Sequence, residues 1–440
     1  MYSFSKFEIV KKNYLNLLLA AIPLSFIAGN MAININIVLI ILSSLFIFGR
    51  NLFKINYFFL DKLIFLFFLI ILLSSIINDY FFYMAELYWK GNFSTVTKSF
   101  AFLRYLLLYI ILRFLVEKEI INLKIFFISC TFFSLFVCFD IFYQLFNGED
   151  IFGFKTIGTG RKLGGPFDDE LVAGGFIQRF SIFAFFVLPI FYLDKIRKYY
   201  KILIPIFFLI FFSGIILSGN RMPLILFLLT ISLIFIFQKQ VRKYLIFFIT
   251  IFFLSFFIAT NFSSNIKTNF LDFSDQIYRI TNIIIKQDFD NKYIPLHLKE
   301  FSTFYETWRL NKYIGGGIKN FRYYCHKRAN IKPDSKFICN MHPHNYYLEV
   351  LTETGIFGFI TLIGIFFLTL YISFYKKYFS QSLLKDNILI IPFIFLFIAE
   401  IFPLKSTGSF FTTGNTTYLI IIMGILIGLA RKDNSIEKKN

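Results

Sequence analysis

The chain changes character within the stretch His342-Pro343-His344-Asn345-Tyr346-Tyr347-Leu348-Glu349-Val350-Leu351-Thr352-Glu353-Thr354-Gly355. A long polar segment ends here and a long apolar segment begins. The apolar run is long enough to cross a bilayer, which takes about 20 residues in a helix. Two histidines, an asparagine and a carboxylate are therefore expected at a membrane–water boundary.

The composition of the whole chain indicates the class of protein. Of its 440 residues, 57% are hydrophobic and 16% are charged, and the mean hydropathy is +0.68. A water-soluble domain could not bury so much apolar surface. The sequence therefore predicts an all-α polytopic membrane protein embedded in a lipid bilayer.

The apolar stretches predict twelve membrane-spanning helices. They are residues 14–29, 31–48, 62–77, 97–116, 123–146, 171–193, 200–217, 222–237, 243–260, 346–374, 387–402 and 415–430. The chain then divides into residues 1–260 with nine spans and short loops, residues 261–345 as one large loop, and residues 346–440 with three spans and a tail.

Basic residues give the expected orientation. With the N-terminus in the cytoplasm, the inner segments hold 23 Lys and Arg, whereas the four short outer loops hold seven. Cytoplasmic loops of membrane proteins carry such an excess, so both termini are expected in the cytoplasm and the large loop on the outer face. The inner loops would face anionic lipid. This accounts for much of the net charge of +19 without nucleic acid as a partner.

The large loop is also basic. Its 13 Lys and Arg exceed its seven Asp and Glu, which leaves a net charge of +6. The positive-inside rule does not explain a net positive charge on the outer face, although long loops are largely exempt from that rule. An anionic ligand would explain it.

Several charged residues lie within predicted helices or at their ends, where charge is costly and by default marks function. They are Arg104, Asp140, Arg179 and Glu400, together with Arg221 in the turn Ser218-Gly219-Asn220-Arg221. All lie toward the outer face in this topology, which predicts a polar cavity open to the outside. The alternative is a set of buried ion pairs, with Asp140–Arg179 as the first candidate.

A second outer loop, residues 153–170, combines glycines with acidic residues that include Asp169. Glycine-rich loops can expose backbone N–H groups to phosphate. This loop follows no predicted strand and lacks the phosphate-loop pattern, so a compact surface loop is the alternative.

His344 directly precedes the helix predicted from Asn345 to about Phe374. About 30 residues at 1.5 Å each make ~45 Å, which exceeds a hydrocarbon core of ~30 Å, so the first turns should protrude. The positive end of the helix dipole favours a neutral imidazole, as a general base requires, and also favours phosphate. Asn345 is the expected N-cap. Glu353 either orients the site or pairs with a basic side chain.

The four cysteines fall into two pairs. Cys130 and Cys138 lie in the fifth predicted helix and are expected to be packing thiols. Cys325 and Cys339 lie in the outer loop, where an oxidising compartment favours a disulfide. Zinc bound by Cys325, His326, Cys339, His342 and His344 is an alternative with an unusual spacing, and free thiols are another. A site without a metal is expected.

Three stretches resemble motifs of the O-antigen ligase and polymerase superfamily. They are His344-Asn345-x-x-Leu348 with Glu353-x-Gly355-x-x-Gly358, Ser218-Gly219-Asn220-Arg221, and Gly315-Gly316-Gly317-x-x-Asn320-Phe321-Arg322. The resemblance implies a metal-independent, inverting glycosyltransferase of the bacterial inner membrane that uses no cofactor. Its site would face the periplasm, and its donor would be a glycan on undecaprenyl pyrophosphate.

The resemblance also assigns roles to residues. It implies His344 as the general base and Arg221 as a ligand of the pyrophosphate. Asn345, Glu353 and Asp169 are the expected supporting residues. Members of the superfamily offer a second loop arginine, often a few residues before a Trp. Here Arg309 follows Trp308 instead, so the choice stays open among Arg279, Arg309 and Arg322.

Ligases and polymerases of this superfamily share the donor and differ in the acceptor, which is a lipid A–core sugar or another lipid-linked repeat. The single large loop before His344 favours the ligase, with the polymerase as the alternative. A transporter of polysaccharide or lipid intermediates should show charges at the midplane and repeat symmetry. The sequence shows neither.

Overall fold

A computed structural model describes residues 6–81, 94–156, 162–168, 170, 172–238, 242, 245–262, 264–286, 296–327, 339, 343–379, 389–406 and 408–432. These residues are helical apart from turns, loops and isolated β-bridge positions such as the pair Glu149 and Lys155. Bundle helices before the large connection are α1 (Lys6–Ala20), α2 (Ile22–Ile27), α3 (Asn30–Phe48), α4 (Phe59–Phe81), α5 (Thr95–Phe102), α6 (Arg104–Glu117), α7 (Leu123–Asn147), α8 (Ala173–Phe180), α9 (Ala184–Phe191), α10 (Leu193–Leu217), α11 (Arg221–Phe237) and α12 (Leu245–Phe262). The remaining helices are α13 (Ser264–Lys286), α14 (Leu296–Trp308), α15 (Phe321–Tyr324), α16 (Tyr346–Leu370), α17 (Ile390–Glu400) and α18 (Thr413–Lys432).

The predicted class, an all-helical polytopic membrane protein, is confirmed. Within the described residues, seven helical stretches are long and apolar enough to cross a membrane: Asn30–Phe53, Phe59–Tyr80, Thr95–Glu117, Leu123–Asn147, Ala173–Phe191, Tyr346–Tyr378 and Thr413–Lys432. Four shorter apolar helices accompany them: Lys12–Ile27, Ile202–Leu217, Arg221–Phe237 and Ile390–Glu400. The stretch predicted at residues 243–260 falls on α12.

Some predicted spans are interrupted. Residues 97–116 form two helices that meet at Leu103, and residues 171–193 include the short 3-10 turn η4 (Ser181–Phe183) between α8 and α9. The expected unbroken helix 346–374 is also interrupted, because Gly355 has the non-helical angles φ 68° and ψ −170°. Beyond α16 the chain continues as the π-helix η7 (Tyr371–Phe379).

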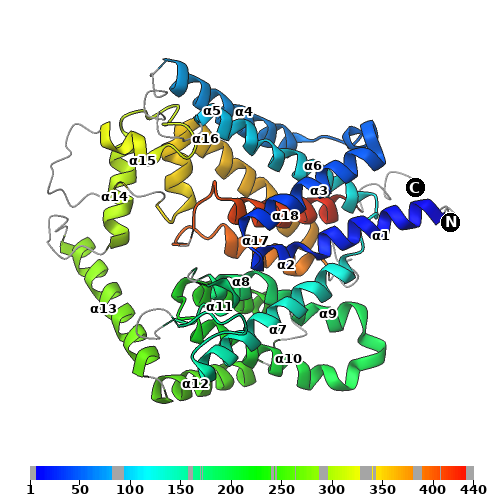
Figure 1. Cartoon of the computed structure of the whole chain (residues 1–440), viewed down its shortest axis with the longest axis vertical. Coiled ribbons are helices and arrows are strands. Elements are labelled where there is room, and N and C mark those ends of the chain that lie inside the picture. Colours follow the sequence, from blue (N-terminus) through cyan, green and yellow to red (C-terminus); the bar gives the residue numbers. More distant parts are fainter. Residues whose placement is uncertain are drawn as a thin grey trace.

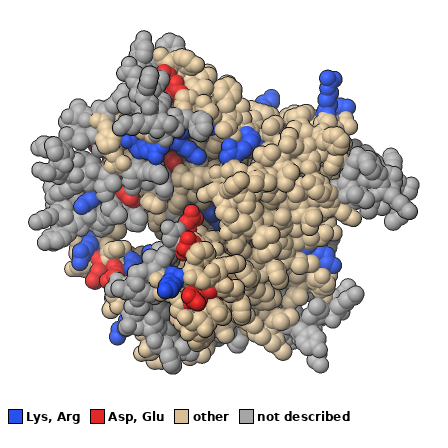
Figure 2. All heavy atoms as spheres, in the orientation of Figure 1, with Lys and Arg blue, Asp and Glu red and all other residues tan. Residues whose placement is uncertain are grey.

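The last helix, α18, lies in the core of the bundle and packs closely on α6. A Cβ atom on Gly428 would lie 2.6 Å from Val116 Cβ, and one on Gly424 would lie 3.1 Å from Leu112 Cβ. Small residues at helix interfaces let two backbones approach in this way. Figure 2 shows a broad surface with few charged side chains over the right-hand part of the molecule, as expected for contact with lipid.

The connection between α12 and α16, residues 263–345, is called here the connecting segment. It carries α13, α14 and α15, so the predicted large loop is helical over much of its described length. These three helices lie together at one edge of the molecule, on the opposite side from the first turns of α1 (Figure 1).

Residues 311–320 of the connecting segment are inserted against α16 and α4, a contact called here the glycine anchor. The N–H groups of Gly316 and Gly317 donate to the carbonyl oxygens of Thr352 and Glu353 at 3.0 and 2.9 Å. From α4, the Ser74 hydroxyl donates to Ile314 O at 2.7 Å, and the Asn78 amide donates to Gly315 O at 2.8 Å. The anchor therefore supplies partners for the backbone groups that the interruption of α16 leaves unpaired.

Glycine is required on both sides of this contact. A Cβ atom on Gly315 would lie 2.5 Å from the backbone nitrogen of Thr354, and one on Gly355 would lie 2.1 Å from the carbonyl oxygen of Tyr313. Both glycines also have positive φ, at 77° and 68°, where L-residues are strained. The two glycine motifs seen in the sequence thus form one interface.

Candidate functional site

His344 lies between the connecting segment and the first turn of α16. It is partly buried, and its φ of 54° is unusual for a residue with a side chain. Positive φ at a non-glycine residue costs free energy and concentrates at functional sites. The backbone thus gives His344 a defined position at the positive end of α16.

Asn345 holds this position as the N-cap of α16. Its side-chain oxygen accepts hydrogen bonds from the N–H groups of Tyr347 and Leu348 at 3.0 and 3.2 Å. Its amide nitrogen donates to Pro403 O at 2.9 Å. Asn345 therefore both starts the helix and ties it to the α17–α18 loop, residues 401–412.

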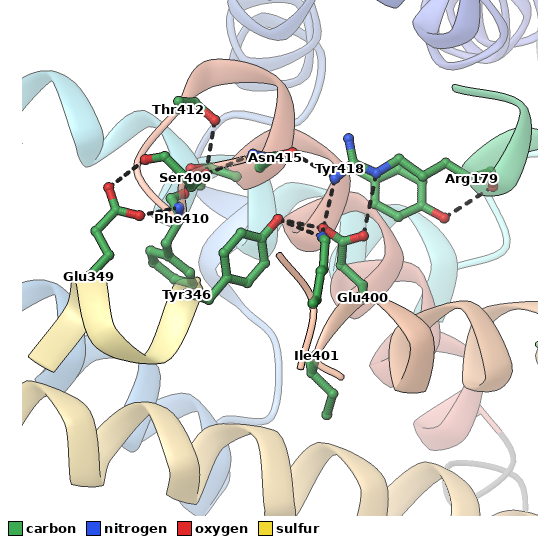
Figure 3. A network of polar contacts seen from close by, with 12 residues as sticks. Arg179, Tyr346, Glu349, Glu400, Ile401, Ser409, Phe410, Thr412, Asn415 and Tyr418 are labelled. Atoms are coloured by element: carbon green, nitrogen blue, oxygen red, sulfur yellow. Dashed lines mark hydrogen bonds and ion pairs between the residues drawn. The ribbon is translucent and has the colours of Figure 1, made fainter. Parts of the chain in front are cut away.

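Arg179, Glu400 and Lys405 form a buried charged cluster. Figure 3 shows Arg179 and Glu400 of this cluster beside Tyr346 in the first turn of α16. The Glu400 carboxylate accepts hydrogen bonds from Arg179 at 2.9 and 3.3 Å and from the hydroxyl of Tyr346 at 2.6 Å. It also forms an ion pair with Lys405, whose ammonium group donates to the Tyr346 hydroxyl at 2.9 Å. Glu400 is 1% exposed and Lys405 is 4% exposed. Burial lowers the pKa of Lys405 to about 7, against the opposing effect of Glu400.

Arg179 forms a buried ion pair, as the alternative predicted, but its partner is Glu400 and the candidate pairing with Asp140 is wrong. Arg179 also donates to the side-chain oxygen of Asn415 at 2.6 Å, and its guanidinium carbon lies 4.8 Å from the ring centre of Tyr418. It is thus directed toward α17 and α18. Asp140 instead accepts a hydrogen bond from the N–H of Ile151 at 2.8 Å. The carboxylate of Asp140 therefore shapes the loop after α7.

The glycine-rich loop after α7 is only partly described, and the proposed supporting residue Asp169 lies outside the described residues. Where the loop is described, the N–H of Gly165 donates to the side-chain oxygen of Gln144 at 3.0 Å. That N–H is already used within the protein. The described part therefore favours the compact surface loop over a phosphate loop.

Arg221 begins α11 after a tight turn. Gly219 has a φ of 67°, and the Ser218 hydroxyl donates to Ile215 O at 2.7 Å. The Arg221 guanidinium donates to the side-chain oxygen of Gln276 on α13 at 3.1 Å and lies 5.5 Å from the ring centre of Phe273. The structure thus brings α13 of the connecting segment against Arg221.

The three candidate second arginines lie in different surroundings. Arg279 is exposed and follows Gln276 by three residues, so it lies on the same side of α13. Arg309 forms an exposed ion pair with Glu306 at 3.2 Å. Arg322 lies on α15, its guanidinium carbon 4.8 Å from the ring centre of Tyr323. Of the three, Arg279 is the one whose helix contacts Arg221, through Gln276 and Phe273.

A cavity of about 420 Å³ lies between the turn before α11 and the buried charged cluster. Its walls come from five places along the chain. They are the α2–α3 junction with Phe26 and Asn30, the residues around Phe167 and Glu170, α8 with Phe176, Gln178 and Arg179, the start of α11 with Asn220 and Pro223, and the residues Lys405, Thr412 and Asn415. Asn220 directly precedes Arg221, and Lys405 contacts Tyr346, two residues after His344. The cavity therefore lies between the surroundings of Arg221 and those of His344.

Glu353 belongs to the glycine anchor. Its carboxylate accepts a hydrogen bond from the N–H of Lys319 at 2.7 Å, and its carbonyl oxygen accepts one from Gly317. Cys325 and Cys339 are joined by a disulfide with a Cα–Cα distance of 5.7 Å. That bond removes the two thiolates that the zinc alternative needs. His342 lies outside the described residues.

Sequence reasoning did not single out Lys405, Tyr346, Asn415 or Gln178. Lys405 is one of the seven basic residues in the short outer loops of the predicted topology. A signal was present, because Lys405 follows Glu400 by five residues at the end of an apolar stretch. Gln178 and Asn415 carry no such signal, since an isolated amide in an apolar helix has many structural roles.

Comparison with known proteins bears on the same residues. No curated protein matches the chain significantly. A protein-family model does match, and the matched stretch contains both Arg221 and His344. Its domain is shared by O-antigen ligases and polymerases, which are transferases with lipid-linked glycans as substrates. Residues 206–363 of the chain thus match the family model described as O-antigen ligase.

Proposed function

We propose that this protein is an O-antigen ligase of the bacterial inner membrane. In this proposal twelve helices span the membrane, both termini lie in the cytoplasm, and the connecting segment and the cavity face the periplasm. The donor is a glycan on undecaprenyl pyrophosphate, and the acceptor is a sugar hydroxyl of lipid A–core. The observation that carries the proposal is that Arg221 and His344 both lie within the matched family domain, while Asn220 beside Arg221 and Lys405, which contacts Tyr346, line one cavity.

The chemistry is a single displacement at the anomeric carbon of the donor sugar. The acceptor oxygen attacks that carbon, the bond from carbon to the pyrophosphate oxygen breaks, and His344 accepts the proton of the acceptor hydroxyl. A general base of this kind typically contributes about 10²–10⁴-fold in rate. One displacement inverts the configuration, and no metal is required for it.

The pyrophosphate leaves with its bonding electron pair and needs charge stabilisation. Arg221 supplies a guanidinium at the start of α11, and Arg279 supplies a second one from the face of α13 that contacts Arg221. Guanidinium groups bind phosphate oxygens through paired hydrogen bonds. The positive end of α16 adds a further favourable potential near the same place.

A polymerase is the second candidate, because ligases and polymerases share this domain. Its acceptor would be another lipid-linked repeat in place of lipid A–core. The donor, His344 and Arg221 would keep the same roles.

A lipopolysaccharide gel tests the proposal. A strain that lacks the gene is complemented with wild type, with His344→Ala, or with His326→Ala, which changes an exposed histidine of the same connecting segment. Loss of all ladder bands with His344→Ala, together with accumulation of lipid-linked polymer, is expected for a ligase. Collapse to core plus one repeat indicates a polymerase, and an unchanged ladder in the deletion strain contradicts both.

A further inference from the structure

Gln178 is a polar group for which the protein supplies an incomplete set of partners. It lines the cavity from α8 and is 3% exposed. Its amide nitrogen is buried and has no hydrogen-bond partner among the described residues. Leaving such a group unpaired costs about 1–3 kcal/mol. Because Gln178 lines the cavity, a rotation of its side chain would bring this amide to an acceptor on a ligand there.

The charges around the cavity balance. Arg179 and Lys405 line it with two positive charges, and Glu170 lines it with one negative charge. The carboxylate of Glu400 lies directly behind Arg179 and Lys405 and adds a second negative charge. The sum is zero with Lys405 protonated. An anion such as pyrophosphate gains little in such a place, whereas a neutral ligand with many hydroxyl groups finds both donors and acceptors.

The walls of the cavity fit the same kind of ligand. Phe26, Phe167 and Phe176 give the cavity apolar walls, and Asn30, Asn220 and Asn415 are among its polar lining residues. Sites for small molecules combine apolar walls with a few placed polar groups, in volumes of roughly 300–1,000 Å³. The volume of about 420 Å³ lies in this range.

We infer that the cavity binds the sugar that is joined directly to the pyrophosphate of the lipid-linked donor, with Gln178 as one of its hydrogen-bond partners. This inference rests on the proposed function. The turn Ser218–Arg221 then separates two tasks. Arg221 faces α13 and takes the phosphates, while Asn220 and Pro223 line the cavity that takes the sugar. The anomeric carbon would lie between them, on the side of the cavity where Lys405 contacts the first residue of α16.

Binding measurements on the purified full-length protein in nanodiscs test the inference. The two probes are undecaprenyl pyrophosphate without sugar and the glycan-bearing donor lipid extracted from cells that lack the gene. Wild type should bind the glycan-bearing lipid more tightly than the sugar-free lipid. Gln178→Met keeps the size of the side chain and should lose about threefold to tenfold in affinity for the glycan-bearing lipid only. Arg221→Ala should weaken the binding of both lipids.

Two controls separate ligand binding from folding. Gln178→Met removes an unpaired buried amide, so its thermal midpoint should be unchanged or higher. Gln238 follows the last residue of α11, far along that helix from Asn220, and its amide donates to the Tyr378 hydroxyl. The control variant Gln238→Met should keep the preference for the glycan-bearing lipid.

The outcomes distinguish the two proposals. If wild type binds both lipids equally, or if Gln178→Met keeps the preference, the sugar site is wrong and the pyrophosphate site stands. If wild type binds neither lipid, the proposed function is wrong as well.

Discussion

The N–H of Gly317 donates to the carbonyl oxygen of Glu353 at 2.9 Å. Two separate sequence motifs thus meet at one backbone contact. One is the glycine run at residues 315–317, and the other is the segment after His344 that contains Glu353. The contact fixes residues 311–320, within the connecting segment, relative to the first two turns of α16. Because His344 precedes those turns, the anchor also positions the proposed base.

Replacement of Gly355 by alanine should destabilise the protein. The backbone of Gly355 has φ 68° and ψ −170°, a region almost restricted to glycine, where other residues cost about 1–3 kcal/mol before any clash. The added Cβ would also lie 2.1 Å from Tyr313 O. We expect a lower thermal midpoint in detergent and weaker transfer.

Gly364→Ala on the same helix is the matched control. A Cβ at Gly364 meets its nearest neighbour, Leu63 Cδ1, at 3.4 Å, and alanine favours helix by about 1 kcal/mol over glycine. This variant should keep or raise the midpoint. Equal midpoints for the two variants would show that the anchor is not needed for stability.

His344→Ala should lose about 10²–10⁴-fold in transfer rate with purified donor and acceptor, the usual worth of a general base. His344→Gly should be equally inactive and slightly more stable than His344→Ala, because glycine adopts the φ of 54° without strain. The comparison separates the imidazole from the backbone conformation. Retained transfer in either variant would remove His344 from the mechanism.

Among the loop arginines, Arg279→Gln should weaken donor binding, whereas Arg309→Gln should leave it close to wild type. Arg279 lies on the face of α13 that contacts Arg221, whereas Arg309 is engaged in an exposed pair with Glu306. Such exposed pairs contribute about 0–1 kcal/mol. The measurement is the KM for the donor lipid. A raised KM for Arg309→Gln with an unchanged one for Arg279→Gln would reverse the assignment.

Reduction of the disulfide should loosen the connecting segment. Cys325 and Cys339 are 14 residues apart, and a crosslink over about 15 residues stabilises by about 3 kcal/mol in the chain-entropy description. Reducing agent should lower the thermal midpoint and speed proteolysis between α14 and α16. Thiol labelling of denatured, unreduced protein should modify only the buried free cysteines Cys130 and Cys138, so four labelled thiols would rule the bond out.

Lys405 should make stability depend on pH. Burial lowers its pKa from 10.5 to about 7, so between pH 7 and about 10.5 the unfolded chain holds a proton that the folded protein lacks. The free energy of unfolding therefore rises with pH in this window and decreases again as the pH falls toward 7. The thermal midpoint of wild type should rise relative to that of Lys405→Met between pH 7 and 9.5. Parallel curves for the two proteins would contradict the shift.

The fold could be predicted from the sequence where its causes are local. Apolar stretches located the helices, because spanning a bilayer demands about 20 apolar residues in a row. Asn345 could be recognised as an N-cap, since that role depends on a few residues around it. The interruption at Gly355 could not be predicted, because it depends on partners from residues 311–320 and from Ser74.

The candidate site could likewise be predicted only where its features depend on neighbouring residues in the sequence. The motifs marked His344 and Arg221, and charges in apolar helices marked Arg179 and Glu400. Their pairing was missed because these two residues lie 221 positions apart, and a sequence pattern contains no distances of that kind. Gln178 became informative only through its burial and its unpaired amide.

The glycine anchor has a mechanical consequence. By fixing residues 311–320 to α4 and α16, it cuts the connecting segment into two shorter stretches, residues 263–310 and 321–345. A movement of α13 or α14 would have to break the hydrogen bonds of the anchor before it displaced His344. In the proposed ligase, a displacement of α13 or α14 by the lipid-linked substrate would therefore leave the start of α16 in place.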